Sequence, residues 1–361
     1  MYLPGVIGLL CLVLHHAKAN VIMSPEPCNG GYCVPKHLCP TGSVEGGTIS
    51  GQNDLITLQV DEESECGDFM KICCAGSSVT TAANNAAPKA DDTCGISNPV
   101  GLVYNLESNL TYAKYAEFPW TVAIFRISFS SKDIVLIHVG GGTLIHPKFV
   151  VTAAHILKKP HRYSARFGEW NIKSDAEIYA AQEIGIEENI LHPSFRDLCT
   201  PENNIALAVL KRSVLYTAHI RPLCLPTPQD VFEGQRCIAT GWGKDVRTQL
   251  PAPIMKRIEL DVVPRASCQT SYQIADSDSS FRLHRSELCA GAADLQDTCD
   301  KDGGTPMACP KEDGSYVLAG ITSWGLDCGK PDAPGVYVDV AKFACWINDT
   351  IEGYEELHAE E

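Results

Sequence analysis

The sequence predicts an all-β fold, a sandwich or a barrel, with one helix near its C-terminal end. Short apolar runs separated by Gly, Pro and Asn turns predict the strands, the clearest being residues 120–125, 149–151, 206–210 and 316–321. Helical periodicity is nearly absent until residues 340–347. Six Cys within residues 28–74 add a small cross-linked segment before the β-rich region.

The length and composition limit the possible classes of protein. A chain of 361 residues favours two or three structural units. Hydrophobic residues make up 45% and charged residues 20%, so the chain can bury a core. The formal charge of −15 argues against nucleic acid or an anionic membrane surface as a partner. Seventeen Cys indicate an oxidising compartment, because cytosolic proteins rarely carry so many thiols without binding metal.

Residues 1–19 are typical of a secretory signal peptide. An apolar stretch is followed by a small-x-small cleavage site at residues 17–19. A membrane anchor is the alternative, but the stretch is shorter than the ~20 residues that span a bilayer. Cleavage removes Cys11 and leaves sixteen Cys, an even number, as full pairing requires. We therefore expect a secreted chain without a membrane span, with glycosylation acceptors at Asn109 and Asn348.

The six-Cys segment, residues 28–74, is too short to build a sufficient core unaided. Its Cys are therefore predicted to form three disulfides, although spacing alone leaves fifteen connectivities. Metal binding is the alternative, which a secreted chain with no nearby paired His disfavours. Residues 75–93 are small and polar and are predicted to be a flexible linker to a larger domain at residues 94–361.

Four motifs occur in order along the larger domain. Residues 152–155 read Thr-Ala-Ala-His, 203–207 read Asn-Asn-Ile-Ala-Leu, 241–243 read Gly-Trp-Gly, and 300–306 read Asp-Lys-Asp-Gly-Gly-Thr-Pro. Together they resemble the signatures of the chymotrypsin-like serine proteases. The resemblance implies a chymotrypsin-like double six-stranded β-barrel that ends in a C-terminal helix.

The resemblance also implies disulfides. In the larger domain it implies the pairs Cys94 with Cys224, Cys237 with Cys309, Cys268 with Cys289, and Cys299 with Cys328. Parity then pairs Cys199 with Cys345, joining the loop before Asn204 to the C-terminal helix. The family's disulfide beside the catalytic His is missing, because we place Val139 and Ile156 at its two positions. The six-Cys segment resembles the clip domain of arthropod proteases, which implies the pairs Cys28 with Cys73, Cys33 with Cys66, and Cys39 with Cys74.

The positions that match the catalytic triad are degenerate. Acyl transfer needs a hydroxyl nucleophile, an imidazole with an acceptor nitrogen and a carboxylate that orients it. Gly303 stands at the nucleophile position and has no side chain, which excludes covalent catalysis. Asn204 stands at the carboxylate position, where its amide favours the wrong tautomer of the ring. His155 is then a relict base or, as we favour, a packed and hydrogen-bonded histidine. We predict a pseudo-protease, not an enzyme.

Two further positions depart from the family pattern. Lys301 replaces the Gly that normally supplies an oxyanion donor, and its long side chain crowds the site. Between Gly95 and Phe118 the only basic residue is Lys114, and no activation cleavage site follows it. Asp302, which in the family pairs with the newly formed α-amine, must find another partner or remain solvated.

The specificity pocket matches the family better. The resemblance implies a pocket for an Arg or Lys side chain at Asp297, Gly325 and Gly335, and the alternative is that Asp297 is a solvated loop acid. No cofactor or metal is expected. Three other acidic residues could line a Ca²⁺-binding loop, namely Asp175, Glu177 and Glu183. A solvated acidic face is the better interpretation of them.

The resemblance implies an adaptor or cofactor in an extracellular protease cascade of arthropod innate immunity, the one that activates prophenoloxidase and leads to melanisation. The expected partners are extracellular proteases or their zymogen substrates, with prophenoloxidase among them. A protein that recognises microbial surfaces is the alternative. An active trypsin-like protease that uses a substitute hydroxyl is the third hypothesis.

Overall fold

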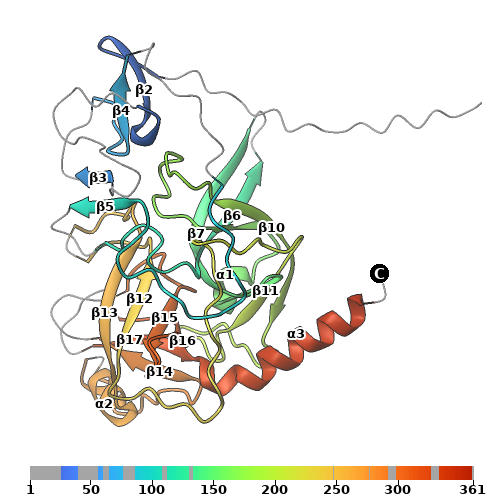
Figure 1. Cartoon of the computed structure of the whole chain (residues 1–361). Helices are drawn as coiled ribbons and strands as arrows, with labels where there is room; N and C mark the ends of the chain where they lie inside the picture. The colour runs from blue at the N-terminus through green and yellow to red at the C-terminus, as the bar shows by residue number, and fades with distance from the viewer. Residues whose placement is uncertain are drawn as a thin grey trace, which may run out of the picture.

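Two closed six-stranded barrels form the body of the molecule, which confirms the double-barrel prediction (Figure 1). The computed structural model describes residues 26–39, 56–59, 65–75, 86–107, 112–129, 133–246, 248–275, 277–291, 298–326 and 333–359. The predicted signal peptide at residues 1–19, Asn109, Asp297 and Cys328 lie outside the described residues.

Each barrel is an antiparallel sheet closed on itself. In spatial order the first joins β10 (Gln182–Leu191), β11 (Ala206–Leu210), β8 (Phe149–Thr152), β7 (Ile134–His146), β6 (Thr121–Phe129) and β9 (Arg162–Phe167). The second joins β12 (Arg236–Gly241), β13 (Lys256–Val263), β14 (Glu287–Ala290), β17 (Gly335–Asp339), β16 (Tyr316–Trp324) and β15 (Pro306–Pro310). The four strand runs predicted from the sequence all fall within or overlap these strands.

Helices are few in the described residues. In the two-barrel part they are α1 (Ala154–Leu157), α2 (Arg265–Ala275), the 3-10 turn η2 (Val340–Phe343) and α3 (Ala344–His358). The predicted C-terminal helix is confirmed, and α3 continues well beyond residue 347 and projects from the barrels (Figure 1). Helix α2 was not predicted, because only Cys268 and Tyr272 of this helix are buried and its apolar pattern is correspondingly weak.

Side chains on both faces of the inner strands are buried, and alternate residues pack on opposite faces. Strand β11 is buried along its whole length. Its residues Ala206, Ala208 and Leu210 pack in a cluster built by the first barrel, whereas Leu207 and Val209 pack in a central cluster that also includes part of α3. This second face explains why the strand is a continuous apolar run with no polar alternation.

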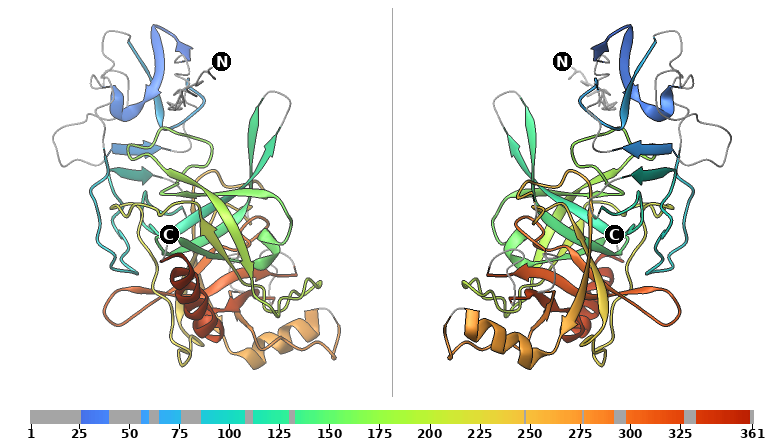
Figure 2. Two further views of the ribbon diagram at one scale, coloured as in Figure 1. Left: turned by 90° about the vertical axis from the view of Figure 1, so that its right-hand side faces the viewer. Right: turned by 90° about the vertical axis from the view of Figure 1, so that its left-hand side faces the viewer.

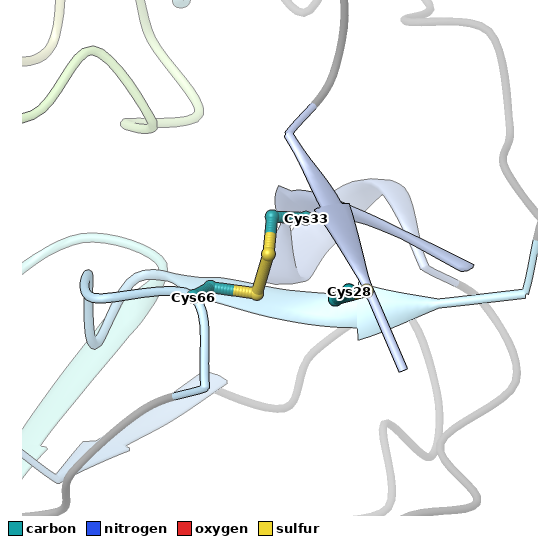
Figure 3. Close-up of side chains that lie close together, drawn as sticks. All are labelled: Cys28, Cys33 and Cys66. Carbon is teal, nitrogen blue, oxygen red and sulfur yellow. A yellow bond between two sulfur atoms is a disulfide. The ribbon is translucent and has the colours of Figure 1, made fainter. Parts of the chain in front are cut away.

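The described part of the clip segment (residues 28–74) contains a small cross-linked sheet. Strands β1 (Pro27–Cys28), β2 (Gly31–Pro35) and β4 (Lys71–Cys74) form it, with the 3-10 turn η1 (Lys36–Leu38) after β2. All three implied disulfides are confirmed: Cys28–Cys73, Cys33–Cys66 and Cys39–Cys74. Three of these sulfurs lie close together, those of Cys28, Cys33 and Cys66 (Figure 3). Since each is in a disulfide, this cluster offers no thiolate to a metal ion.

The clip segment packs against the barrels. Strand β3 (Ile56–Gln59) pairs in parallel with β5 (Tyr104–Glu107), so the two parts of the chain share a two-stranded sheet. The clip segment and the β6–β7 hairpin extend from the same end of the molecule, with α2 at the opposite end (Figure 2). Residues 88–90 of the predicted linker are hydrogen-bonded to residues 216–218, so this part of the linker lies along the protease-like domain.

The disulfides of the larger domain agree with the resemblance except at one pair. Three implied bridges are present, Cys94–Cys224, Cys237–Cys309 and Cys268–Cys289. Cys299 is also disulfide-bonded, and its implied partner Cys328 lies outside the described residues. The predicted pair of Cys199 and Cys345 is wrong, because both thiols are free and exposed. Cys345 lies off the face of α3 that buries Ala344 and Ile347, and Cys199 lies on an exposed loop.

None of the helices within the described residues is long and apolar enough to cross a membrane. The acceptor Asn348 is exposed on α3, and its glycosylation stays a prediction.

Candidate functional site

The three positions that the sequence analysis matched to a catalytic triad meet where the barrels adjoin. His155 lies in α1, directly after β8, and Asn204 immediately precedes β11. Gly303 belongs to the loop before β15 in the second barrel, and its carbonyl oxygen accepts a hydrogen bond from the Gly141 N–H at 2.9 Å. The turn into α1 requires small residues, since Ala153 and Ala154 are both fully buried.

Asn204 forms two hydrogen bonds with His155, one with its backbone and one with its imidazole. The backbone N–H of His155 donates to Asn204 Oδ1 at 2.9 Å, which sets the orientation of the amide. The Nδ2 group of Asn204 then faces His155 Nδ1 at 2.8 Å and also donates to Ser323 Oγ at 2.8 Å. Because Nδ2 can only donate, Nδ1 must be the acceptor.

The imidazole is therefore in the tautomer that cannot act as a general base. Burial lowers the pKa of His155 below its ordinary value, so the ring is neutral near pH 7. With Nδ1 as the acceptor, the single ring proton lies on Nε2. This outcome agrees with the expectation that an amide at residue 204 favours the wrong tautomer.

No nucleophile faces the Nε2 atom from residue 303. A Cβ added at Gly303 would lie 2.7 Å from His155 Nε2, so this is the closest position for a side chain, and it carries none. The other hydroxyls of the cleft have different partners: Thr298 with Tyr337, Thr322 with Thr305, and Ser323 with Asn204. The geometry thus gives no support to a substitute hydroxyl.

Asp302 has a partner that the sequence analysis did not name. Its carboxylate is fully buried and forms an ion pair with Lys256 Nζ at 2.5 Å. It also accepts hydrogen bonds from the N–H groups of Gly243 at 2.7 Å and Cys299 at 2.9 Å. His138 lies near the same carboxylate, but burial lowers its pKa to about 4, so Lys256 supplies the positive charge.

The buried carboxylate of Asp302 explains the two glycines of the Gly-Trp-Gly motif. A Cβ at Gly241 would lie 2.3 Å from Asp302 Oδ1, and one at Gly243 would lie 2.4 Å from Asp302 Cγ. Both positions must therefore be glycine for the carboxylate to fit against the backbone. Since Lys256 comes from β13 of the uncut chain, no newly formed α-amine is needed to compensate the charge of Asp302.

A cavity of about 600 Å³ adjoins the three positions. Two of the three predicted pocket residues, Gly325 and Gly335, line it together with Thr298 and Trp324. The third, Asp297, lies outside the described residues. Lys301 also lines the cavity and has a left-handed φ of 72°, a conformation that normally favours glycine.

One of the two positions that match the family's disulfide beside His155 differs by one residue from the prediction. A Cβ at Gly140 would lie 2.7 Å from Ile156 Cδ1, so Gly140, and not Val139, faces Ile156 across the lost bridge. The three consecutive glycines at residues 140–142 made the register ambiguous in the sequence.

The acids interpreted as a solvated face do not behave as one group. Asp175 is exposed, as predicted. Glu177 is half-buried: it accepts the Asn171 N–H at 3.0 Å, and its pKa is raised well above its ordinary value by burial and then by the adjacent Glu169. Glu183 forms an ion pair with Arg166 at 2.8 Å. The solvated-face prediction is therefore wrong for Glu177.

Comparison with known proteins gives the family. The Trypsin family model matches residues 108–347. The inactive CLIP domain-containing serine protease A8 of Anopheles gambiae is 48% identical over 331 residues, which cover 91% of this chain and 90% of that protein. This chain belongs to the CLIP-domain serine proteases of the trypsin family.

Two more relatives agree with this membership. The inactive CLIP domain-containing serine protease A28 of Anopheles gambiae is 40% identical, covering 96% of this chain and 94% of that protein. Phenoloxidase-activating factor 2 of Galleria mellonella is 37% identical over 72% of this chain and 89% of its own length. The CLIP-domain protein described here is an inactive member of the family, a pseudo-protease.

Proposed function

We propose that this CLIP-domain protein is a secreted, non-catalytic adaptor in an extracellular protease cascade that activates prophenoloxidase and leads to melanisation. The observation that carries the proposal is Gly303, which places no side chain beside a correctly positioned His155 in an otherwise intact protease fold. Such a site can bind a protein segment but cannot form an acyl intermediate. The similarity to phenoloxidase-activating factor 2 supports the choice of cascade.

The proposal assigns a role to each part of the chain. Residues 1–19 direct secretion, the clip domain at residues 28–74 is one contact face, and the linker at residues 75–93 connects it to the protease-like domain at residues 94–361. The barrels provide a rigid scaffold whose loops contact extracellular proteases, their zymogen substrates or prophenoloxidase itself. Within this scaffold, His155, Asn204 and Gly303 are the remains of a triad.

We also propose that the cavity bordered by Gly325 and Gly335 accepts an Arg or Lys side chain without cleaving after it. Asp297 would supply the negative charge. A peptide aldehyde with a terminal Arg tests this proposal directly by isothermal titration. Binding of the Arg aldehyde, with at least about tenfold weaker binding in Asp297→Asn, supports it, and equal binding of the two chains contradicts it.

The adaptor role is tested in plasma from which the protein has been depleted. Purified chain, intact or cleaved in the linker, is added back, and phenoloxidase activity is measured. The adaptor role predicts restored activity that persists after treatment of the chain with a fluorophosphonate, since no nucleophile is present. Loss of restoration after that treatment would instead indicate an active protease. Binding to microbial cell walls without any change in phenoloxidase activity would favour the surface-recognition alternative.

A further inference from the structure

A second, smaller cavity of about 300 Å³ also borders His155, and it shares Lys301 and Gly303 with the first cavity. Gly303 and Ile156 border it, and five basic side chains line it: Arg126, Lys158, Lys159, His161 and Lys301. Arg126 comes from β6, and the next three follow α1. This concentration of basic residues contrasts with the formal charge of −15 of the whole chain.

Most of the four Arg and Lys charges in this set have no counter-charge. Among the described residues, Arg126, Lys159 and Lys301 form no ion pair, whereas Lys158 is bound to Asp197 at 2.6 Å. The Nε atom of Arg126 is buried without a hydrogen-bond partner in the same set. By contrast, the buried cation Lys256 is paired with Asp302. A concave site lined by one sign of charge concentrates the field and attracts anions.

The base of the cavity adds neutral donors. The proton on His155 Nε2 faces residue 303, as the hydrogen bonds of Asn204 require. In the loop 301–304, the N–H groups of Asp302 and Gly304 donate inward to Cys299 and Thr322. Those of Lys301 and Gly303 make no hydrogen bond to any described residue. Together these groups form a set of hydrogen-bond donors and cations at the cavity.

We propose that this cavity binds the carboxylate side chains of an acidic peptide segment presented by a partner protein. A small concave site with donors at its base fits one or two Asp or Glu side chains, whereas a sulfated glycan chain needs a long open basic strip. This inference rests on the proposed function in one respect, namely that the partner is a protein of the cascade. The binding of carboxylates can be measured without that assumption.

The test uses the full-length chain and fluorescein-labelled nonapeptides whose central three residues are Glu or, as a matched neutral probe, Gln. Fluorescence anisotropy is expected to show binding of the Glu peptide that weakens as salt is raised, and no binding of the Gln peptide. Arg126→Gln and Lys301→Gln are each expected to weaken binding by about tenfold, and Lys301→Glu by more.

Lys311→Gln is the control, because it removes the same charge from an exposed turn between β15 and β16, outside the cavity. Equal binding of the Glu and Gln peptides, or equal weakening by the control, would overturn the proposal. Binding of a heparin oligosaccharide without binding of the Glu peptide would overturn it in favour of a glycan site. Thermal unfolding of each variant verifies that it is folded. If the cavity binds carboxylates but the variants do not change phenoloxidase activity, only the proposed role in the cascade is contradicted.

Discussion

At the scale of single residues, Asn204 determines what His155 can do. An Asp at this position would accept the Nδ1 proton and leave Nε2 free to accept one, whereas the amide reverses both roles. The change at residue 204 is therefore as informative as the missing hydroxyl at residue 303. The missing hydroxyl removes the nucleophile, and the amide removes the acceptor nitrogen that would activate it.

The first prediction concerns restoring the triad. Gly303→Ser alone is expected to give no labelling by a fluorophosphonate, because the ring still presents a proton on Nε2. Gly303→Ser combined with Asn204→Asp is expected to be labelled. In an active protease of this fold, exchanging the triad Asp for Asn lowers turnover about 10⁴-fold. We expect a difference of this order between the labelling rates of the two variants. The added Cβ lies close enough to the ring to demand a small shift, so labelling is a better measurement than turnover. Equal labelling of the two variants would show that Asn204 does not disable the ring.

The second prediction concerns the adjacent carboxyls of Glu169 and Glu177. Burial raises both pKa values, and the charge of Glu169 further raises the pKa of Glu177. Because the folded state holds the proton more tightly than the unfolded state, this pair stabilises the fold at low pH, and the contribution is lost as pH rises through the raised pKa of Glu177.

Glu177→Gln keeps the acceptor for the Asn171 N–H and removes the repulsion. We expect its melting temperature to exceed that of the wild type near neutral pH, by about 2–4 °C for each kcal/mol gained. The difference should shrink on acidification. Differential scanning calorimetry between pH 5 and pH 8 measures both effects, with exposed Glu188→Gln as the control. A wild type that becomes steadily more stable up to pH 8, with the variant following in parallel, would contradict this account.

At the scale of elements, β13 holds the loop that carries residues 299–304. Lys256 is the first residue of that strand, and its ammonium group donates to Asp302 and to the Lys244 carbonyl oxygen at 2.8 Å. The loop that would form an active site is thus fastened to the second barrel by a side chain of the intact chain. Cleavage is not required for this arrangement.

The third prediction tests this ion pair. Lys256→Met leaves the carboxylate of Asp302 buried without its counter-charge and should cost about 3–5 kcal/mol of unfolding free energy. Lys256→Met with Asp302→Asn should recover part of the loss, because no buried charge remains. The surface pair of Lys244 and Asp300, at 2.7 Å, provides the control: Lys244→Met should cost about 1 kcal/mol or less. Urea denaturation gives these values. Similar costs for the two single lysine variants would show that the buried pair adds no special stability.

The sequence predicted elements whose pattern is local and missed those that depend on distant neighbours. Strands such as β8 and β11 are continuous apolar runs, and the clip disulfides follow from Cys spacing together with the resemblance. Lys256 lies 46 residues from Asp302, and no sequence pattern links the two. Parity failed for Cys199 and Cys345 because it assumes that every thiol is paired. The environment of Glu177 was missed because its partners Glu169 and Asn171 are brought to it by the fold and not by a local sequence pattern.

At the scale of the whole molecule, the clip segment is part of the protease-like core and not a separate appendage. Met70 is 1% exposed and belongs to the same buried cluster as Trp170 and Phe118. Asp68 accepts a hydrogen bond from Ser174 at 2.6 Å, and the ring of Phe69 contacts Trp170. An adaptor built in this way presents both contact faces in one fixed arrangement.

The last prediction follows from this continuity. Met70→Ala should cost about 2–5 kcal/mol, since it opens a cavity at the junction. It should also speed hydrogen exchange in β3, β5 and residues 170–176, because the clip segment loses its anchor on the barrels. Ile72→Ala is the matched control, since among the described residues Ile72 packs against the internal clip cluster of Val34, Cys39 and Cys74 and not against the central cluster. It should speed exchange within the clip segment and leave residues 170–176 protected. If Met70→Ala also left residues 170–176 protected, the two parts would be in contact without being energetically coupled, and the adaptor's two faces would be free to move independently.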